Sequence, residues 1–143
     1  MADIRKLTKN LSVAPQLVAS DLLAVASQGY KSVLCNRPDH EEVTQPTYRE
    51  VQSAIDEQGL VSEFQPVNSS TISDEDVDAF AQHLSSLTAP VLAYCRSGTR
   101  CTVLWALSEA GKRPVDEILS IAAQAGYSLE ALRPRLEARA STT

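Results

Sequence analysis

The part of this sequence best suited to chemistry is a short polar loop between an apolar run and an amphipathic segment. Residues 91–94 are apolar, as in a buried strand, and the apolar spacing from residue 100 onward is typical of a helix. Between them stand Cys95, Arg96, Ser97, Gly98, Thr99 and Arg100. The N–H groups that begin a helix lack partners and converge on the preceding loop, where the helix dipole adds roughly half a positive charge. The sequence therefore predicts an anion-binding site.

An anion-binding site of this kind also favours a thiolate. A free thiol has a pKa near ~8.5, which falls beside arginines and at a helix N-terminus, so we expect Cys95 to be a nucleophile. Gly98 would allow a tight turn, Thr99 would cap the helix, and Arg100 would bind a tetrahedral oxyanion. The plainer interpretation is a buried cysteine that fills space at a strand end.

The elements that must position this loop alternate along the chain. An edge hairpin is predicted over residues 4–14, and buried strands over 31–35, 60–67 and 91–94. Helices are predicted over 21–28, 47–58, 73–87, 100–111, 114–126 and 128–138. This order implies an α/β fold, a central mostly parallel sheet flanked by helices. Ligands bind such sheets at the carboxyl ends of the strands, where Cys35 and Cys95 both lie.

Length and composition limit the function classes. The 143 residues fit one domain, expected over 1–139, with a disordered tail over 140–143. A formal charge of −5 supplies no basic field for nucleic acid. We expect no signal peptide, membrane span or membrane partner, and hence a cytoplasmic protein. His40 and His83 are too isolated to predict a metal site, and no cofactor is expected; the oligomeric state stays open.

The chain also resembles a bacterial family over residues 3–126, through segments 4–7, 11–16, 35–39 and 95–100. That family comprises phosphatase-like proteins and the amino-terminal domain of beta-lactamase-hydrolase-like proteins. The resemblance implies a dual-specificity-phosphatase-like fold whose loop has the length found in rhodanese-type sulfurtransferases, with four residues between cysteine and arginine. It also suggests that Arg37 and Asp39 shape the pocket, although the two side chains could instead pair and brace their own loop.

Two chemistries compete for this loop. The phosphatases that the chain resembles protonate the leaving group with an aspartate, whereas residues 66–70 hold no carboxylate here. Tyr94 stands where their histidine precedes the nucleophile, and Cys101 stands where a hydroxyl follows the arginine. Sulfite or a thiolate needs little protonation to depart. We therefore expect a sulfurtransferase that moves sulfur from thiosulfate or a persulfide, through a Cys95 persulfide, to a thiol acceptor such as glutathione.

The alternatives are a cysteine-dependent phosphatase and a non-catalytic thiol sensor. In either enzyme, Arg96, Ser97, Gly98 and Thr99 are expected to help bind the anion, although Arg96 could equally be a solvated charge. An odd number of cysteines argues against a structural disulfide framework. If their strands are neighbours, Cys35 could reach Cys95, a pairing that the resemblance also suggests. Cys101, in the first helical turn, is a second possible redox partner.

Overall fold

The computed structural model describes residues 2–142, in which five strands form one sheet in the order β1-β2-β5-β3-β4. The strands are β1 (Arg5–Lys6), β2 (Leu11–Ala14), β3 (Ser32–Cys35), β4 (Val61–Phe64) and β5 (Val91–Tyr94). Strand β1 pairs with β2 in the antiparallel sense, and every other pairing is parallel. The predicted edge hairpin and mostly parallel sheet are therefore confirmed, although β4 is shorter than predicted.

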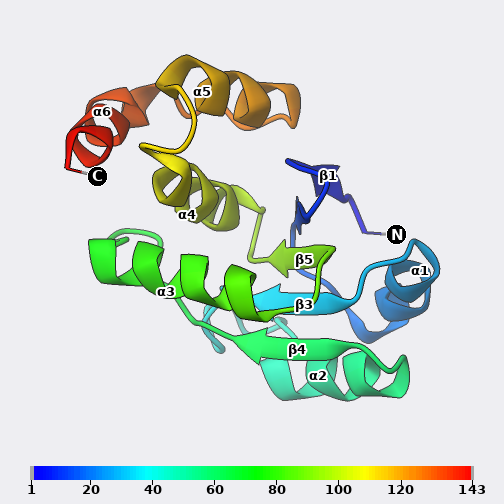
Figure 1. The fold of residues 1–143 in the computed structure, drawn as a ribbon. Helices are drawn as coiled ribbons and strands as arrows, with labels where there is room; N and C mark the ends of the chain where they lie inside the picture. The colour runs from blue at the N-terminus through cyan, green and yellow to red at the C-terminus, as the bar shows by residue number, and fades with distance from the viewer. Residues whose placement is uncertain (1, 143) are drawn as a thin grey trace.

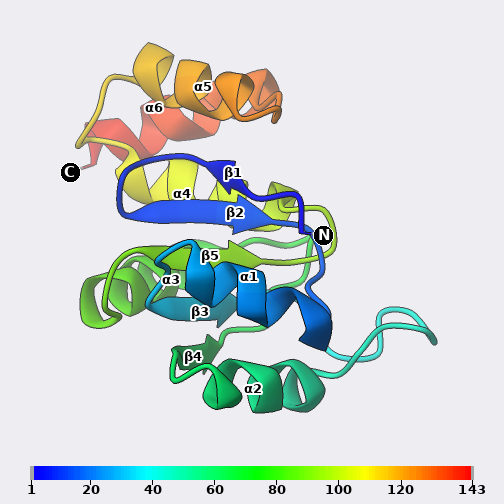
Figure 2. The ribbon, with the colours of Figure 1, turned by 90° about the vertical axis from the view of Figure 1, so that its right-hand side faces the viewer.

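Helices cover both faces of the sheet (Figure 1). They are α1 (Leu22–Ser27), α2 (Tyr48–Glu57), α3 (Asp74–Ser86), α4 (Thr99–Glu109), α5 (Val115–Gln124) and α6 (Arg133–Ser141). Figures 1 and 2 show α1 and α2 on one face and α3 and α4 on the other, with α5 and α6 packed outside α4. The α/β fold class expected from the sequence is confirmed.

The sheet separates two hydrophobic cores, because alternate side chains of a strand point to opposite faces. Along β5, Val91 and Ala93 pack in the core beneath α3 and α4, while Leu92 and Tyr94 pack in the core beneath α1 and α2. Cys95 continues the alternation and lies in the α3/α4 core. The nucleophile candidate thus follows the central strand on the side of the helix that its own loop begins.

The parallel strands carry the loop sequences to one edge of the sheet. In Figure 2 these strands point toward the side from which residues 36–46 project. Strand β3 lies between β4 and β5, so the segment after Cys35 is a direct neighbour of the segment that follows Tyr94. This arrangement brings residues 36–46 over the loop of residues 95–99, as parallel sheets commonly do for ligand sites.

The C-terminal end differs from the expectation. A 3₁₀ turn, η2 (Glu130–Leu132), precedes α6, and Pro134 stands in the first turn of α6, where its missing N–H costs no hydrogen bond. Helix α6 continues through Ser141, so Ala140 and Ser141 belong to a helix and not to the predicted disordered tail. Thr143 lies outside the described residues. Within residues 2–142, no helix combines the length and the apolar character that crossing a membrane requires.

Candidate active site

The predicted loop forms a tight turn around the Cys95 sulfur. The N–H of Gly98 donates to Cys95 Sγ at 3.1 Å, and Gly98 adopts a left-handed conformation with φ of 91°. Gly98, and not Thr99, occupies the cap position of α4, and no side chain caps the helix there. The expected capping role of Thr99 is therefore wrong. The N–H of Thr99 makes only a long hydrogen bond to Ser97 Oγ, at 3.4 Å, so the start of α4 can still face an anion.

Cys95 is buried, with 1% of its surface exposed, and its surroundings favour the thiolate. The pKa of Cys95 is lowered to about 6, first by a hydrogen bond from the Cys101 thiol. The N–H groups of Cys101 and Gly98 and the charge of Arg100 lower it further, and together they outweigh burial, which raises it. Burial and the same thiol contact raise the pKa of Cys101. Cys95 is thus the thiol of this pair that ionises near neutral pH.

Arg100 is held in place by a carboxylate from the neighbouring loop. Its Nη1 and Nη2 donate to the two oxygens of Glu41 at 2.9 and 3.0 Å, and Nη1 also donates to the carbonyl of Val67 at 3.0 Å. Burial raises the pKa of Glu41, but Arg100 and Arg37 lower it more, so the carboxylate is ionised. The hydrogen bonds that Arg100 makes within residues 2–142 use Nη1 and Nη2 and not Nε, which leaves that edge of the guanidinium for a ligand.

Arg37 lies behind this contact and not in the cavity. Its buried guanidinium donates to Glu41 at 2.9 Å, to Glu42 at 3.0 Å and to Gln16 at 3.0 Å. Exposed Arg96 pairs with Glu42 at 3.0 Å. Arg37 thus braces residues 36–46 internally and links them to the segment after β2, while Arg96 links them to the loop after β5.

Asp39 also has a structural partner. Its carboxylate accepts a hydrogen bond from the N–H of Tyr48 at 2.7 Å, at the first residue of α2. This contact offsets the positive end of the helix dipole. Asp39 therefore fixes the first part of the 36–46 loop to the start of α2, and it does not line the cavity described next.

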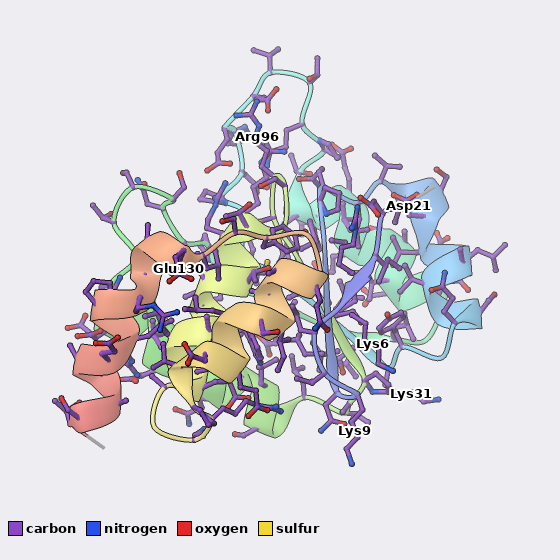
Figure 3. The ribbon with its side chains drawn as sticks, turned by 90° about the horizontal axis from the view of Figure 1, so that it is seen from above. Lys6, Lys9, Asp21, Lys31, Arg96 and Glu130 are labelled. Carbon is purple, nitrogen blue, oxygen red and sulfur yellow. The ribbon has the colours of Figure 1, made fainter. Side chains whose placement is uncertain are left out.

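A cavity of about 500 Å³ opens over the helix-starting loop. Its walls are Glu41, Ser69, Ile72, Arg96, Ser97, Thr99, Arg100 and Val103. Figure 3 shows Arg96 beside the projecting 36–46 loop, at the end of the molecule opposite Lys9 and Lys31. The volume lies within the usual range for small-molecule sites. Of the predicted anion-binding residues, the structure brings Arg96, Ser97, Thr99 and Arg100 to this cavity, whereas the buried Gly98 and Cys95, in the same loop, do not line it.

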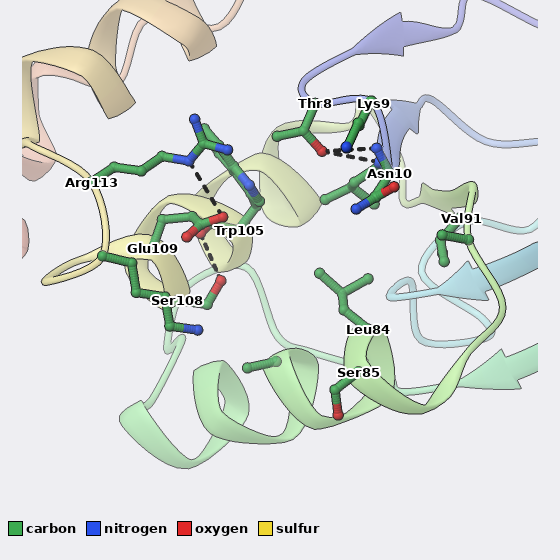
Figure 4. Close-up of a pocket in the computed structure, with 14 residues that line it drawn as sticks. Thr8, Lys9, Asn10, Leu84, Ser85, Val91, Trp105, Ser108, Glu109 and Arg113 are labelled. Carbon is green, nitrogen blue, oxygen red and sulfur yellow. Dashed lines mark hydrogen bonds and ion pairs between the residues drawn. The ribbon is translucent and has the colours of Figure 1, made fainter.

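A second cavity, of about 350 Å³, lies at the opposite end of the sheet (Figure 4). It is bordered by Thr8, Lys9 and Asn10 in the β1–β2 turn and by Trp105 and Glu109 of α4, among others. Because this cavity is far from the Cys95 loop and none of its lining residues is a cysteine, we assign no chemistry to it. No cluster of three or more potential metal ligands occurs in the described part of the chain.

The two possible redox partners of Cys95 lie in different places. Strands β3 and β5 are neighbours, but their register pairs Cys35 with Tyr94, so Cys35 faces the α1/α2 core while Cys95 faces the α3/α4 core. Burial raises the pKa of Cys35 to about 11. Cys101 instead lies on the same side as Cys95 and hydrogen-bonds to it. A bond between Cys35 and Cys95 would require a rearrangement across the sheet.

Sequence reasoning missed Glu41, which orients Arg100. The two residues are 59 positions apart, and no motif or local spacing joins them. The only available signal was position, because Glu41 follows a strand that the predicted sheet places near the one ending at Tyr94. An acidic residue in such a loop is usually solvated, so that signal was weak.

The family described as "Beta-lactamase hydrolase-like protein, phosphatase-like domain" matches residues 3–112. A beta-lactamase hydrolase-like protein of Xylella fastidiosa is 32% identical over 139 residues, which are 96% of this chain and 32% of the relative. Across the relatives of this kind, the chain spans about a quarter to a third of their length.

Solved structures agree with this match. A protein of Neisseria meningitidis, provisionally described as a phosphatase, is 40% identical with a TM-score of 0.88, covering 95% of this chain and 97% of its own. The catalytic domain of the PP-IP phosphatase SIW14 of S. cerevisiae has a TM-score of 0.70 at 12% identity, covering 92% of this chain and 81% of that one. At that identity the likeness shows the fold alone.

These comparisons contradict the expected sulfurtransferase. The matching family and the similar Neisseria structure are both described as phosphatase-like, so the phosphatase alternative has the better support. The loop length that favoured a sulfurtransferase in the sequence is compatible with both chemistries. Both chemistries need a thiolate and a tetrahedral oxyanion held by loop N–H groups and an arginine, so the Cys95–Arg100 spacing does not distinguish them.

Proposed function

The chain belongs to the family of phosphatase-like domains found in beta-lactamase hydrolase-like proteins, and on this premise we propose that it is a cysteine-dependent phosphatase acting on phosphate monoesters. The observation that carries the proposal is the set of donors around one thiolate. Cys95 Sγ accepts from Gly98 N–H at 3.1 Å and lies close to the charge of Arg100, at the start of α4. Such a site stabilises both a thiolate and a bound phosphate.

The proposed reaction has two displacements. The Cys95 thiolate attacks phosphorus, the bond from phosphorus to the leaving oxygen breaks, and that oxygen takes the electron pair. The N–H groups at the start of α4 and Arg100 Nε hold the equatorial phosphoryl oxygens. Water then attacks the thiophosphate, the phosphorus–sulfur bond breaks, and inorganic phosphate and the thiolate are released.

The cavity also favours one kind of leaving group. Glu41 is the carboxylate in the cavity wall, and it is ionised and engaged by Arg100, so it orients the arginine and does not act as a proton donor. The leaving oxygen must then take its proton from solvent, which suits weakly basic groups such as phenolates. Ile72 and Val103 supply an apolar wall against which an aromatic ring can pack.

The first test is release of p-nitrophenolate from p-nitrophenyl phosphate by the wild type, Cys95→Ser and Cys35→Ser. We expect hydrolysis by the wild type and a loss of about a thousandfold or more in kcat/KM for Cys95→Ser, because the alkoxide is a far poorer nucleophile at neutral pH. Cys35→Ser is the matched control. It makes the same change in a buried thiol on the other face of the sheet.

Two results would contradict the proposal. One is hydrolysis by Cys95→Ser at a rate close to that of the wild type, which would place the reaction elsewhere. The other is a wild-type protein that hydrolyses no aryl phosphate although its Cys95 is alkylated rapidly near neutral pH. An equal loss in Cys35→Ser and Cys95→Ser would indicate damage to the fold and would also remove the support for Cys95.

A further inference from the structure

A tyrosine from outside the matched segment contacts the anion-binding loop. Tyr127 follows α5 in the chain, beyond residues 3–112, and its hydroxyl donates to the carbonyl oxygen of Ser97 at 3.1 Å. The ring is half-buried and packs against the α3/α4 core. A Cβ atom added at Gly98 would collide with the Tyr127 hydroxyl, which shows how closely the ring covers the loop.

The hydrogen bond from Tyr127 reaches the peptide unit whose N–H donates to Cys95. The carbonyl of Ser97 and the N–H of Gly98 belong to the same planar peptide unit. On one side of that unit the carbonyl accepts from Tyr127, and on the other side the N–H donates to Cys95 Sγ at 3.1 Å. A continuous chain of hydrogen bonds therefore runs from the Tyr127 hydroxyl through one peptide to the sulfur.

We propose that Tyr127 is a positioning residue for this loop, whose hydroxyl holds the Ser97–Gly98 peptide with its N–H directed at Cys95 Sγ. Tyr127 lies in the segment after α4, so this segment contributes to the site. Its hydroxyl acts through the peptide and does not contact the substrate. Its kinetic consequence rests on the proposed phosphatase function, whereas its effect on the thiol does not.

Two physical effects make the contact matter. Gly98 lies at φ of 91°, and glycine rotates between conformations more readily than any other residue, so the peptide before it is easily turned over. A rotated peptide would present its carbonyl oxygen, and not its N–H, to the thiolate. The hydrogen bond from Tyr127 opposes that rotation. It also polarises the peptide, which strengthens the N–H as a donor to the sulfur.

Other groups that face Cys95 do not share this role. Cys101 and Arg100 reach it from α4, whereas the buried Cys35 lies on the other face of the sheet. Tyr127 comes from the C-terminal segment. It is uncharged near neutral pH, because burial and the thiols of Cys95 and Cys101 raise its pKa. Its removal should therefore change the thiol through the peptide and not through lost charge.

The test compares Tyr127→Phe, which deletes one oxygen, with the wild type and Tyr30→Phe. Tyr30 is the matched control because its hydroxyl also makes one hydrogen bond, to Ser12 Oγ at 2.8 Å, away from the loop. The rate of Cys95 alkylation by iodoacetamide is followed against pH by peptide mass spectrometry. The wild-type midpoint is expected at about 6. Tyr127→Phe should raise that midpoint by roughly 0.5–1 pH unit, and Tyr30→Phe should leave it unchanged.

A second measurement reports the peptide directly. The amide proton resonance of Gly98 should move downfield as Cys95 ionises in the wild type, and this titration should shrink or disappear in Tyr127→Phe. With p-nitrophenyl phosphate, kcat/KM should fall about threefold to tenfold. A wild type without phosphatase activity would remove the proposed function, while a shifted midpoint would still support the role of Tyr127.

The proposal is overturned if Tyr127→Phe lowers the thermal midpoint of unfolding but leaves both the alkylation midpoint and the Gly98 titration unchanged. That result would make Tyr127 a packing residue. It is equally overturned if Tyr30→Phe shifts the alkylation midpoint as much as Tyr127→Phe does, because the effect would then not depend on the Ser97 carbonyl.

Discussion

The three thiols of this chain differ in acidity because each meets different neighbours. Donors at the start of α4 lower the pKa of Cys95 to about 6, while burial without such donors raises the pKa of Cys35 to about 11. Cys101 is fully buried and its thiol hydrogen bond with Cys95 raises its pKa further. At neutral pH the protein thus presents one thiolate, with one protonated thiol in contact with it.

This pairing predicts the product of mild oxidation. Hydrogen peroxide should convert the Cys95 thiolate to a sulfenic acid, with hydroxide leaving from the peroxide. The Cys101 thiol then attacks that sulfur, water departs, and a disulfide forms. Peptide mapping by mass spectrometry should show a Cys95–Cys101 link that Cys101→Ser abolishes and the control Cys35→Ser preserves.

The sequence-based alternative, a Cys35–Cys95 link, is the outcome that would contradict this prediction. Accumulation of sulfinic acid at Cys95 in the wild type, with no disulfide, would also contradict it. Either result would mean that the thiol contact across the first turn of α4 does not control the fate of the oxidised sulfur.

Site residues that are close in sequence could be predicted, whereas those that depend on strand register or tertiary contacts could not. Cys95, Arg100 and the residues between them were predictable because their order along the chain is also their order in space. The direction of Cys35 was not, since it depends on register: its partner is Tyr94, one residue short of Cys95, and a shift of one residue reverses the face. Glu41 and Tyr127 reach the loop through tertiary contacts that no local pattern records.

At the scale of elements, the turn into α4 is the most constrained point of the fold. Gly98 combines a left-handed backbone with close contact to the Tyr127 hydroxyl. The carbonyl of Gly98 also accepts hydrogen bonds from the N–H and the hydroxyl of Thr102. The loop is therefore fixed on both sides, by its own helix and by the segment that follows α5.

Substitution of this glycine should separate backbone strain from collision. Gly29→Ala is the matched control, because Gly29 has nearly the same φ, 94°, but nothing lies within 4 Å of an added Cβ. We expect Gly29→Ala to lower the free energy of unfolding by about 1–2 kcal/mol through left-handed strain alone. Gly98→Ala should add a further loss of about 1–3 kcal/mol from overpacking. Urea unfolding followed by circular dichroism measures both.

A double variant completes this comparison. Gly98→Ala combined with Tyr127→Phe should recover part of the additional loss, because the colliding oxygen is gone. Equal losses for Gly29→Ala and Gly98→Ala would show that the ring moves aside without cost, and the close contact seen here would then have no energetic weight.

The strands and helices were predicted well because their apolar patterns are strong and their ends are marked. Thr47 and Ser73 cap α2 and α3 through hydrogen bonds to the N–H groups of Glu50 and Asp76. The C-terminal boundary was missed because residues 139–142 carry no apolar spacing typical of a helix. Tertiary contacts hold this last turn: Ala140 packs against the α3/α4 core, and Arg139 donates to the carbonyl of Leu107.

At the scale of the whole molecule, the segment after α4 completes one of the two cores. Its buried apolar side chains include Ile118, Leu119, Leu129 and Leu136, all in the α3/α4 core. Burial of each such side chain contributes roughly 1.5–3 kcal/mol, whereas a whole domain is stable by roughly 5–15 kcal/mol. The α3/α4 core therefore cannot close within residues 3–112 alone.

Truncation tests this dependence. A fragment ending at residue 112 should show no cooperative unfolding in urea and should bind a hydrophobic dye, because it exposes the apolar face of α4. Removal of residues 142 and 143 alone is the control and should leave the unfolding midpoint unchanged. A fragment that unfolds with the midpoint and steepness of the whole chain would refute the expectation.

The ion pairs around the mouth of the cavity have a consequence for the arrival of substrate. Arg37, Arg96 and Arg100 pair with Glu41 and Glu42 there, which leaves one positive charge to balance the Cys95 thiolate, on a chain whose formal charge is −5. A dianion is thus repelled by the net charge at long range, and only the N–H groups at the start of α4 and the Arg100 guanidinium attract it at short range. Because dissolved salt screens the distant repulsion over about 10 Å at 0.1 M, moderate ionic strength should hasten encounter. Capture of an anion at this site should therefore depend on short-range contacts, because the net charge of the protein repels anions at longer distances.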